Sequence, residues 1–373
     1  MSALFSAFTL RSLTLKNRIV VSPMCQYSAR DGVATDYHLV HLGRFALGGF
    51  GTVMIEAAAV TPEGRITYGD VGLWSDAHIA PLKRISDFIK AQGAASAIQI
   101  AHAGRKASTP LWWRGSFNET EAEKPVVGFT QWTPLAPSAL PHSASTTLPR
   151  EMTLNDIAAT RAAFIAAAQR ADAAGFDILE VHAAHGYLLN QFLSAVANRR
   201  DDDYGGSAEK RRRLPLEIAK AVRAVWPADK PLFVRISVED HLPGGVTLDD
   251  SIAFARDLKA LGVDVIDCSS GGFDGAAVKP GPSYQVPYAA AIRTAAGVET
   301  MAVGLITGAE EADGIIARGD ADLVALGRTA LDDPNWPHHA ARTLQVENPY
   351  AVLHKQAGFA VRIRDGVLQP KPA

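Results

Sequence analysis

Eight short apolar runs rich in β-branched residues recur along the chain, separated by amphipathic stretches with helical period. The runs are apolar almost throughout rather than at every second residue, which is typical of parallel strands buried on both faces. This alternation predicts a parallel sheet covered by helices. The predicted strands are Ile19–Ser22, Thr52–Glu56, Ser96–Ile100, Ile178–His182, Leu232–Ser237, Val263–Cys268, Thr300–Val303 and Leu323–Leu326.

The stretches between these runs predict helices, and two of them begin with a recognisable cap. Thr153 with Asp156, and Thr247 with Asp250, resemble capping boxes in which Asp takes the place of Glu. The predicted helices include His78–Ala91, Leu154–Ala174, Arg211–Val225, Asp249–Leu261, Ala309–Arg318 and Pro334–Leu344.

Eight parallel strands are the number that closes a (β/α)₈ TIM barrel. The main alternative is an open doubly wound sheet, which normally carries a glycine-rich dinucleotide fingerprint after its first strand. Here Pro23-Met24-Cys25 follows the first strand, so the barrel is favoured. We expect a single α/β barrel domain over residues 1–349 and a tail over residues 350–373.

Two segments interrupt the alternation. Residues 8–15 alternate apolar and polar side chains and predict a small hairpin that closes the barrel floor. Residues 109–149 are rich in Pro, Ser and Thr, contain Trp112, Trp113 and Trp132, and predict an insertion after the third strand. This insertion is either a substrate wall or a surface excursion with its own aromatic cluster.

The composition narrows the class of protein. The chain carries 37 basic and 39 acidic residues, a net charge of −2, which argues against nucleic acid or an anionic membrane as the main partner. Its two cysteines cannot form a disulfide framework, and its first residues lack the pattern of a signal peptide. No apolar stretch is long enough to cross a bilayer, so we expect a cytoplasmic protein.

The most informative motif follows the fourth predicted strand, where His182, His185 and Tyr187 stand close together. Two neutral imidazoles at the end of a buried strand can hold one oxygen atom, and a nearby phenol can return a proton. The same imidazoles could instead bind a metal together with Glu180 or Asp177, or could be structural.

Other polar and glycine residues lie at the carboxyl ends of the predicted strands, where barrel enzymes keep their sites. Gly304, Gly327 and Arg328 suit a phosphate group, although the glycines could simply turn the chain. Arg235 points towards the barrel mouth, with an ion pair to Glu56 or Glu180 as the alternative. Two further residues each have two interpretations: Gln99 could meet a ring edge or bridge two strands, and Cys25 could be reactive or merely packed.

Taken together, these motifs resemble the Old Yellow Enzyme family of FMN-dependent ene-reductases, in its xenobiotic-reductase and thermophilic-like branch. The resemblance covers roughly residues 4–344, and its motifs occur in the family order. The matching segments are residues 15–19, 22–27, 56–66, 99–106, 182–187, 198–207, 267–271 and 327–328.

The resemblance implies FMN bound tightly but without a covalent bond across the barrel mouth. By analogy, the residues that line or bind this FMN are Ser22, Pro23, Met24, Cys25, Ala57, Gln99, Arg235, Gly304, Gly327 and Arg328. Among these, Gln99 would hold the pyrimidine edge, Arg235 would lie near N1, and the two glycines with Arg328 would bind the phosphate.

The resemblance also implies a reaction. NADPH or NADH, bound transiently, would give hydride to flavin N5, which would pass it to the β-carbon of an α,β-unsaturated carbonyl or nitro compound. His182 and His185 would bind the substrate oxygen beside Tyr27, and Tyr187 would protonate the α-carbon. The family implies a homodimer or homotetramer. The rival hypotheses are a metal-dependent lyase or hydrolase and a non-catalytic flavin- or phosphate-binding protein.

Overall fold

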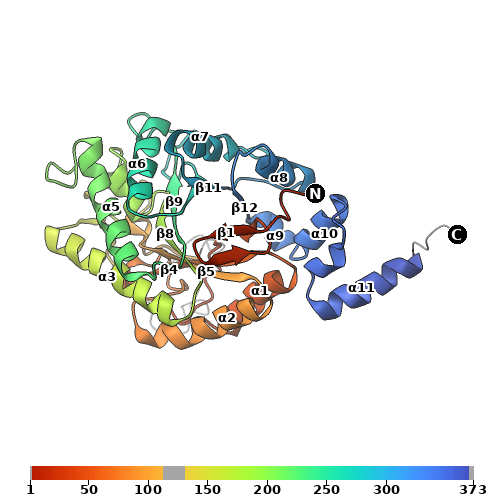
Figure 1. Cartoon of the computed structure of the whole chain (residues 1–373). Helices are drawn as coiled ribbons and strands as arrows, with labels where there is room; N and C mark the ends of the chain where they lie inside the picture. The colour runs from red at the N-terminus through yellow and green to blue at the C-terminus, as the bar shows by residue number, and fades with distance from the viewer. Residues whose placement is uncertain (1, 112–130, 369–373) are drawn as a thin grey trace.

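The barrel predicted from the sequence is present. The computed structural model describes residues 2–111 and 131–368, and in it eight parallel strands form a closed barrel in the order β10-β11-β12-β3-β4-β5-β8-β9 (Figure 1). All eight predicted strands are confirmed, and the open-sheet alternative is wrong. The strands are β3 (Ile19–Val21), β4 (Thr52–Ala59), β5 (Ala95–Ala101), β8 (Ile178–Ala183), β9 (Leu232–Ser237), β10 (Val265–Ser269), β11 (Glu299–Ala302) and β12 (Leu323–Leu326).

Helices surround the barrel on its outer face (Figure 1). All six predicted helices are present, with bounds that differ by up to three residues. The helices are α1 (Asp36–Leu47), α2 (Ile79–Ala91), α3 (Leu154–Ala173), α4 (Leu188–Leu193), α5 (Ala208–Val225), α6 (Leu248–Ala260), α7 (Val286–Ala296), α8 (Ala309–Ala317), α9 (Arg328–Asp332) and α10 (Trp336–Thr343). None of the described helices is both long and apolar enough to span a lipid bilayer.

Both predicted capping boxes form. At the start of α3, the Asp156 backbone N–H donates to Thr153 Oγ1 at 3.2 Å, and the Thr153 N–H donates to Asp156 Oδ2 at 2.8 Å. Thr247 and Asp250 exchange the same pair of hydrogen bonds at the start of α6. Each box satisfies two N–H groups that would otherwise lack a partner at a helix start.

The floor of the barrel interior is apolar. Val20, Met54, Ala97 and Phe233, near the starts of their strands, belong to one buried cluster. The hairpin of β1 (Phe8–Leu10) and β2 (Leu13–Leu15) packs its leucines into the same cluster, which confirms the predicted hairpin at the floor. The barrel is therefore closed at the amino ends of its strands, so a ligand can enter only from the carboxyl ends.

The described part of the insertion lies beside the loop that follows β4. The Trp132 indole N–H donates to the Glu63 carbonyl at 2.8 Å, and the Arg65 guanidinium lies 5.1 Å from the Trp132 ring centroid. Two short parallel strands, β6 (Leu135–Ala136) and β7 (Arg150–Glu151), follow. The predicted Trp112 and Trp113 lie outside the described residues.

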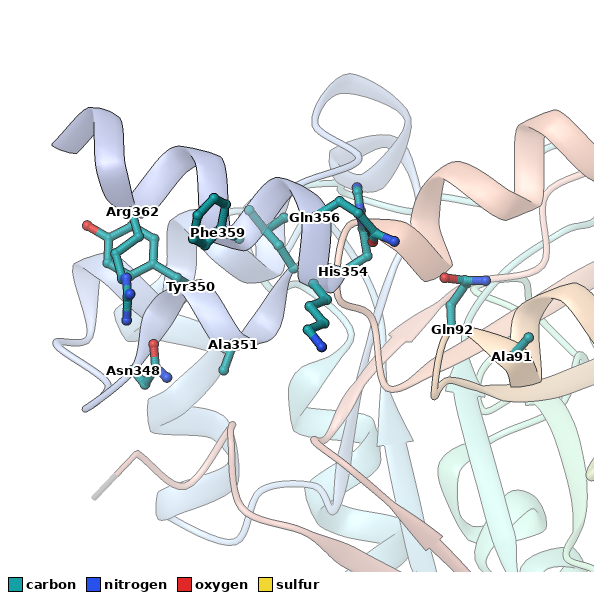
Figure 2. A pocket seen from close by; sticks show the side chains of 12 residues that line it. Ala91, Gln92, Asn348, Tyr350, Ala351, His354, Gln356, Phe359 and Arg362 are labelled. Carbon is teal, nitrogen blue, oxygen red and sulfur yellow. Dashed lines mark hydrogen bonds between the residues drawn. The ribbon is translucent and has the colours of Figure 1, made fainter. Parts of the chain in front are cut away.

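The tail forms the helix α11 (Lys355–Leu368), which projects from the barrel (Figure 1). A groove of about 960 Å³ separates α11 from the end of α2 (Figure 2). Because Ala91 and Gln92 in its wall lead into the start of β5, this groove lies at the floor end of the barrel. This groove is therefore remote from the end at which the predicted site residues lie.

Candidate active site

A polar layer lies directly above the apolar floor of the barrel. Side chains alternate along a strand, so residues two positions after the floor residues also point into the barrel. On or directly after β3, β5, β8, β9 and β10 these residues are Ser22, Gln99, Glu180, Arg235 and Asp267, and all are buried. The irregularity between Ile55 and Ala58 interrupts the alternation in β4, so Glu56 does not follow this rule. The layer of these five residues contains one cation and two carboxyl groups in a space that water reaches poorly.

Three aromatic rings meet above this layer at the end of β8. The His182 ring centroid lies 5.1 Å from that of His185 and 5.2 Å from that of Tyr187. His182 lies at the same level of the barrel as Arg235, because the two residues are register partners in β8 and β9. The predicted pair of imidazoles and the phenol are thus brought together.

The turn after β8 positions the second imidazole. His185 has φ +60°, in the left-handed region that L residues rarely adopt. Its backbone N–H donates to Ser237 Oγ at 2.8 Å, and the next N–H, of Gly186, donates to Asn190 Oδ1 at 2.7 Å. These bonds hold the turn in a conformation that places His185 beside His182.

Burial sets the protonation of the three rings. It lowers the pKa of His182 and His185 well below the usual value, and the nearby Arg235 and Lys106 lower it further. Burial also raises the pKa of the Tyr187 phenol well above its usual value. At neutral pH the site therefore contains two neutral imidazoles, each with one N–H donor, and a protonated phenol.

A cavity of about 240 Å³ connects His185 to the predicted phosphate residues. His185 and Arg235 line its inner part, while Gly304, Gly327 and Arg328 line the rest. Gly304 has φ +121°, and a Cβ there would lie 3.1 Å from Tyr284 Cε1, so only glycine keeps this wall open. A space lined by two arginines suits a ligand with anionic groups.

The remaining predicted flavin residues lie around this space. Met24 lines the cavity, and Pro23 links it to Ser22, which accepts a hydrogen bond from the Arg235 guanidinium at 3.3 Å. Cys25 is partly buried and packs against the cluster that contains Tyr27 and Tyr187.

Ala57, in β4, lines a small hollow that Tyr187 also lines. Gln99 lies one strand away from the cavity wall, where its amide donates to Glu180 Oε1 at 2.7 Å and so bridges β5 and β8.

The ion pair considered as the alternative for Arg235 is present, but its partner is another residue. Arg235 pairs neither with Glu56 nor with Glu180: its Nε lies 3.1 Å from Asp267 Oδ2, on the register partner in β10. Glu56 instead lies 3.2 Å from His38 Nε2 and accepts a hydrogen bond from the backbone N–H of Gln26 at 2.8 Å. Glu56 therefore fixes the loop that carries Cys25.

Within the part of the chain that the structure describes, several buried polar atoms of the site have no hydrogen-bond partner. They are His182 Nδ1, Glu180 Oε2, Arg235 Nε and both carboxylate oxygens of Asp267. Buried polar groups are rarely left unpaired, which indicates a ligand at this site. Across residues 2–111 and 131–368, no three His, Cys, Asp or Glu side chains gather in a way that could hold a metal ion.

Sequence reasoning missed Lys106. It lies at the end of the short 3₁₀ helix η3 (Gly104–Lys106), and its ammonium donates to the carbonyls of His185 and Gly272. Burial lowers its pKa to about 8. Its place five residues after β5, in a loop at the carboxyl end of the barrel, was the available signal.

The comparisons with known proteins agree with this geometry. Residues 3–347 match the model of the NADH:flavin oxidoreductase / NADH oxidase family. The chain is 46% identical over 348 residues to an NADPH dehydrogenase of Geobacillus thermodenitrificans (strain NG80-2), covering 93% of this chain and 96% of the relative. It is 47% identical over 343 residues to an NADPH dehydrogenase of Geobacillus sp. (strain WCH70), covering 91% and 94%.

Solved structures show the same architecture. Morphinone reductase superposes with a TM-score of 0.75 at 27% identity, covering 92% of this chain and 90% of that protein. A 2-naphthoyl-CoA reductase in complex with 2-naphthoyl-CoA superposes with a TM-score of 0.81 at 26% identity, covering 94% of this chain and 53% of the reductase.

Proposed function

The chain belongs to the NADH:flavin oxidoreductase / NADH oxidase family, and from this membership we propose that its site reduces activated carbon–carbon double bonds. The general activity of the chain is that of an FMN-dependent NAD(P)H oxidoreductase, as in the NADPH dehydrogenases to which it is similar. The resemblance to the Old Yellow Enzyme family is thereby confirmed.

The residues around the barrel mouth fit FMN. Arg235 in the inner wall would face the pyrimidine end, and Gly304, Gly327 and Arg328 would hold the phosphate at the other end of the cavity. When bound, FMN supplies a centre that accepts hydride from NAD(P)H and delivers it to an acceptor.

Other residues complete the proposed cofactor site. Ser22, Pro23, Met24 and Cys25 would line the ring system from the loop after β3, and Ala57 would meet it through its backbone. Gln99 would present its amide to the pyrimidine edge.

The central observation is the convergence of two neutral imidazoles beside this cavity. Each can donate an N–H to one carbonyl or nitro oxygen without carrying a charge of its own. Two such donors stabilise the negative charge that develops on this oxygen as the β-carbon accepts hydride. We therefore propose that His182 and His185 bind the substrate oxygen, with Tyr27 forming part of the same wall.

Tyr187 is the proposed proton donor. Its ring packs against His182, and its raised pKa keeps the phenol protonated at neutral pH. A proton held beside the bound oxygen can be passed to the neighbouring α-carbon, which completes the saturation of the double bond.

Assembly and location complete the proposal. We propose one barrel unit over residues 1–349, including the insertion at 109–149, and a tail at 350–373 that takes part in a homodimer or homotetramer in the cytoplasm. Phe359, Ile363 and Val367 recur every four residues on α11 and remain exposed, which supports a role in self-association. Phe359 and Arg362 line the groove in Figure 2. Light scattering of the full chain, compared with a Phe359→Ser variant, measures this association.

The proposed activity has a direct test. The purified protein should show a flavin spectrum that bleaches on addition of NADPH without oxygen and recovers when 2-cyclohexenone is added. Bleaching without recovery would contradict ene-reduction and favour another electron acceptor, while a flavin that NADPH does not bleach would favour the passive binder.

A further inference from the structure

The polar layer beneath the site contains more acid than base. Arg235 contributes one positive charge, whereas Glu180 and Asp267 could contribute two negative charges, and both carboxyl groups are fully buried. An unpaired charge in such a buried place is strongly unfavourable. One of the two acids should therefore be neutral.

The strand register decides which acid is paired. Asp267 lies directly opposite Arg235 in the β9–β10 pair, and its Oδ2 is 3.1 Å from the guanidinium Nε. Glu180 lies opposite Phe233 in the β8–β9 pair, so it is diagonal to Arg235. The Arg235 guanidinium is thus paired with Asp267. The register partners of Glu180 are Gln99 in β5 and Phe233 in β9, and neither is a cation.

The contacts of Glu180 give little support to an ionised carboxylate. Its Oε1 accepts a hydrogen bond from the amide of Gln99 at 2.7 Å, as a carbonyl oxygen does. Its Oε2 is buried and has no hydrogen-bond partner among the described residues, so no donor there stabilises a negative charge. The carboxylate oxygens of Asp267 also lack hydrogen-bond partners among the described residues, but Asp267 Oδ2 lies 3.1 Å from the Arg235 guanidinium, which stabilises its charge.

We propose that Glu180 is a positioning residue that remains a neutral acid in the resting enzyme, and that the charge of the layer under the flavin is therefore zero. The proposal rests on the placement of Arg235 against the cofactor. With Asp267 as its only anionic partner among the described residues, Arg235 would stay a full cation beside the pyrimidine ring, where reduction adds negative charge. An ionised Glu180 would oppose this charge and lower the midpoint potential of the flavin.

The electrostatic surroundings of Glu180 support this assignment. Burial raises its pKa above the usual value, and the neighbouring Asp267 raises it further, while Arg235 and the Gln99 amide act in the opposite direction. His182, next along the same strand on this face, is neutral. These are the titratable and charged groups of β5, β8, β9 and β10 that face Glu180.

Infrared spectroscopy of the FMN-loaded enzyme tests the protonation state. At neutral pH the native protein should show a protonated-carboxyl C=O band that Glu180→Gln lacks. Asp267→Asn should lose the band as well, because Arg235 then takes Glu180 as its partner and the acid ionises. Glu217→Gln, a change of a partly exposed glutamate on α5, should keep it. A native enzyme without this band, or a band that survives in Asp267→Asn, would overturn the proposal.

The midpoint potential of the bound flavin tests the consequence. The charge count predicts that Glu180→Gln and Asp267→Asn each leave the potential near the native value at neutral pH. Only the double variant, which leaves Arg235 without an anion, should raise it. A rise in Glu180→Gln alone, or none in the double variant, would overturn the proposal. None of these measurements uses a substrate, so a failure to reduce enones would count against the proposed function alone.

Discussion

The Lys106 ammonium donates a hydrogen bond to the carbonyl oxygen of His185 at 2.9 Å and another to that of Gly272 at 3.0 Å. It also lies 4.8 Å from the centroid of the Tyr187 ring. One side chain from the loop after β5 thus links the loops after β8 and β10. This clamp holds His185 in the left-handed backbone that the site requires.

Lys106→Met should therefore weaken substrate binding while the flavin stays bound. Methionine keeps the unbranched stem but removes the donors, so the carbonyls of His185 and Gly272 each lose a charge-assisted hydrogen bond. We expect the affinity for phenol, a mimic of the enolate, to fall by about tenfold, or about 1.4 kcal/mol. Titration of the flavin spectrum with phenol measures this. Lys83→Met, which removes an exposed lysine on α2, is the control; equal affinity in both variants would refute the clamp.

Gly272→Ala should damage the same turn from the opposite side. A Cβ at Gly272 would lie 2.1 Å from the carbonyl carbon of His185, so backbone must move. Gly275→Ala is a matched control in the same loop, since Gly275 also has positive φ but meets only Leu242 Cδ2 at 3.8 Å. We expect Gly275→Ala to cost about 1 kcal/mol in the free energy of unfolding. Gly272→Ala should cost clearly more and weaken phenol binding, and urea unfolding that gave equal losses would contradict this.

Tyr187→Phe separates the two half-reactions. The phenol is proposed to protonate the α-carbon and plays no part in accepting hydride from NADPH. Reoxidation of the reduced flavin by 2-cyclohexenone should slow by about 10²-fold or more, the usual scale of general acid catalysis. Stopped-flow measurements should show flavin reduction by NADPH at the native rate. If reoxidation also keeps its native rate, water or another group supplies the proton.

The low pKa of the two imidazoles predicts how binding and stability depend on pH. Since folding depresses the pKa of His182 and His185, both stay neutral in the native state as the pH falls through 6.5, the ordinary value that the unfolded chain keeps. Phenol affinity should change by no more than about twofold between pH 7.5 and 5.5.

The free energy of unfolding, unlike the phenol affinity, should depend on pH in this range. Because the unfolded state binds protons at these histidines first, their contribution to the free energy of unfolding is complete above pH 6.5 and declines below it. Urea unfolding at pH 7.5, 6.5 and 5.5 measures the decline. For phenol binding, a step in affinity centred near pH 6.5 would contradict the prediction, because it would show that His182 or His185 keeps the ordinary imidazole pKa.

The strands could be predicted from the sequence because burial on both faces leaves a local signal. All eight appear as apolar runs, and β9 and β12 have the predicted bounds. The helix α1 was missed because His38 and His41 occupy its buried face, and their burial depends on partners such as Glu56 that are distant in sequence. The helix α11 was also missed, since the described part of the chain buries only Gly358 and Asp365 of it.

In the candidate site, too, some features could be predicted from local sequence and others depend on contacts between distant segments. His182 and Tyr187 could be identified because they lie near the carboxyl end of β8, and strand ends converge in any barrel. The partners that set their chemistry could not. Asp267 rather than Glu56 pairs with Arg235 because of the strand register, and Lys106 reaches His185 because of the path of a loop. Both depend on contacts between segments that the pattern of residues does not encode locally.

The central claim is that two imidazoles hold one substrate oxygen. Phenol titrations of the FMN-loaded native enzyme and of His182→Ala and His185→Ala test it most directly, with His41→Ala as a control for loss of a buried histidine away from the site. Each site variant should keep its flavin and lose affinity for phenol by about tenfold or more, as expected for a buried hydrogen bond of about 1–3 kcal/mol. Native affinity in either site variant, with flavin bound, would contradict the account.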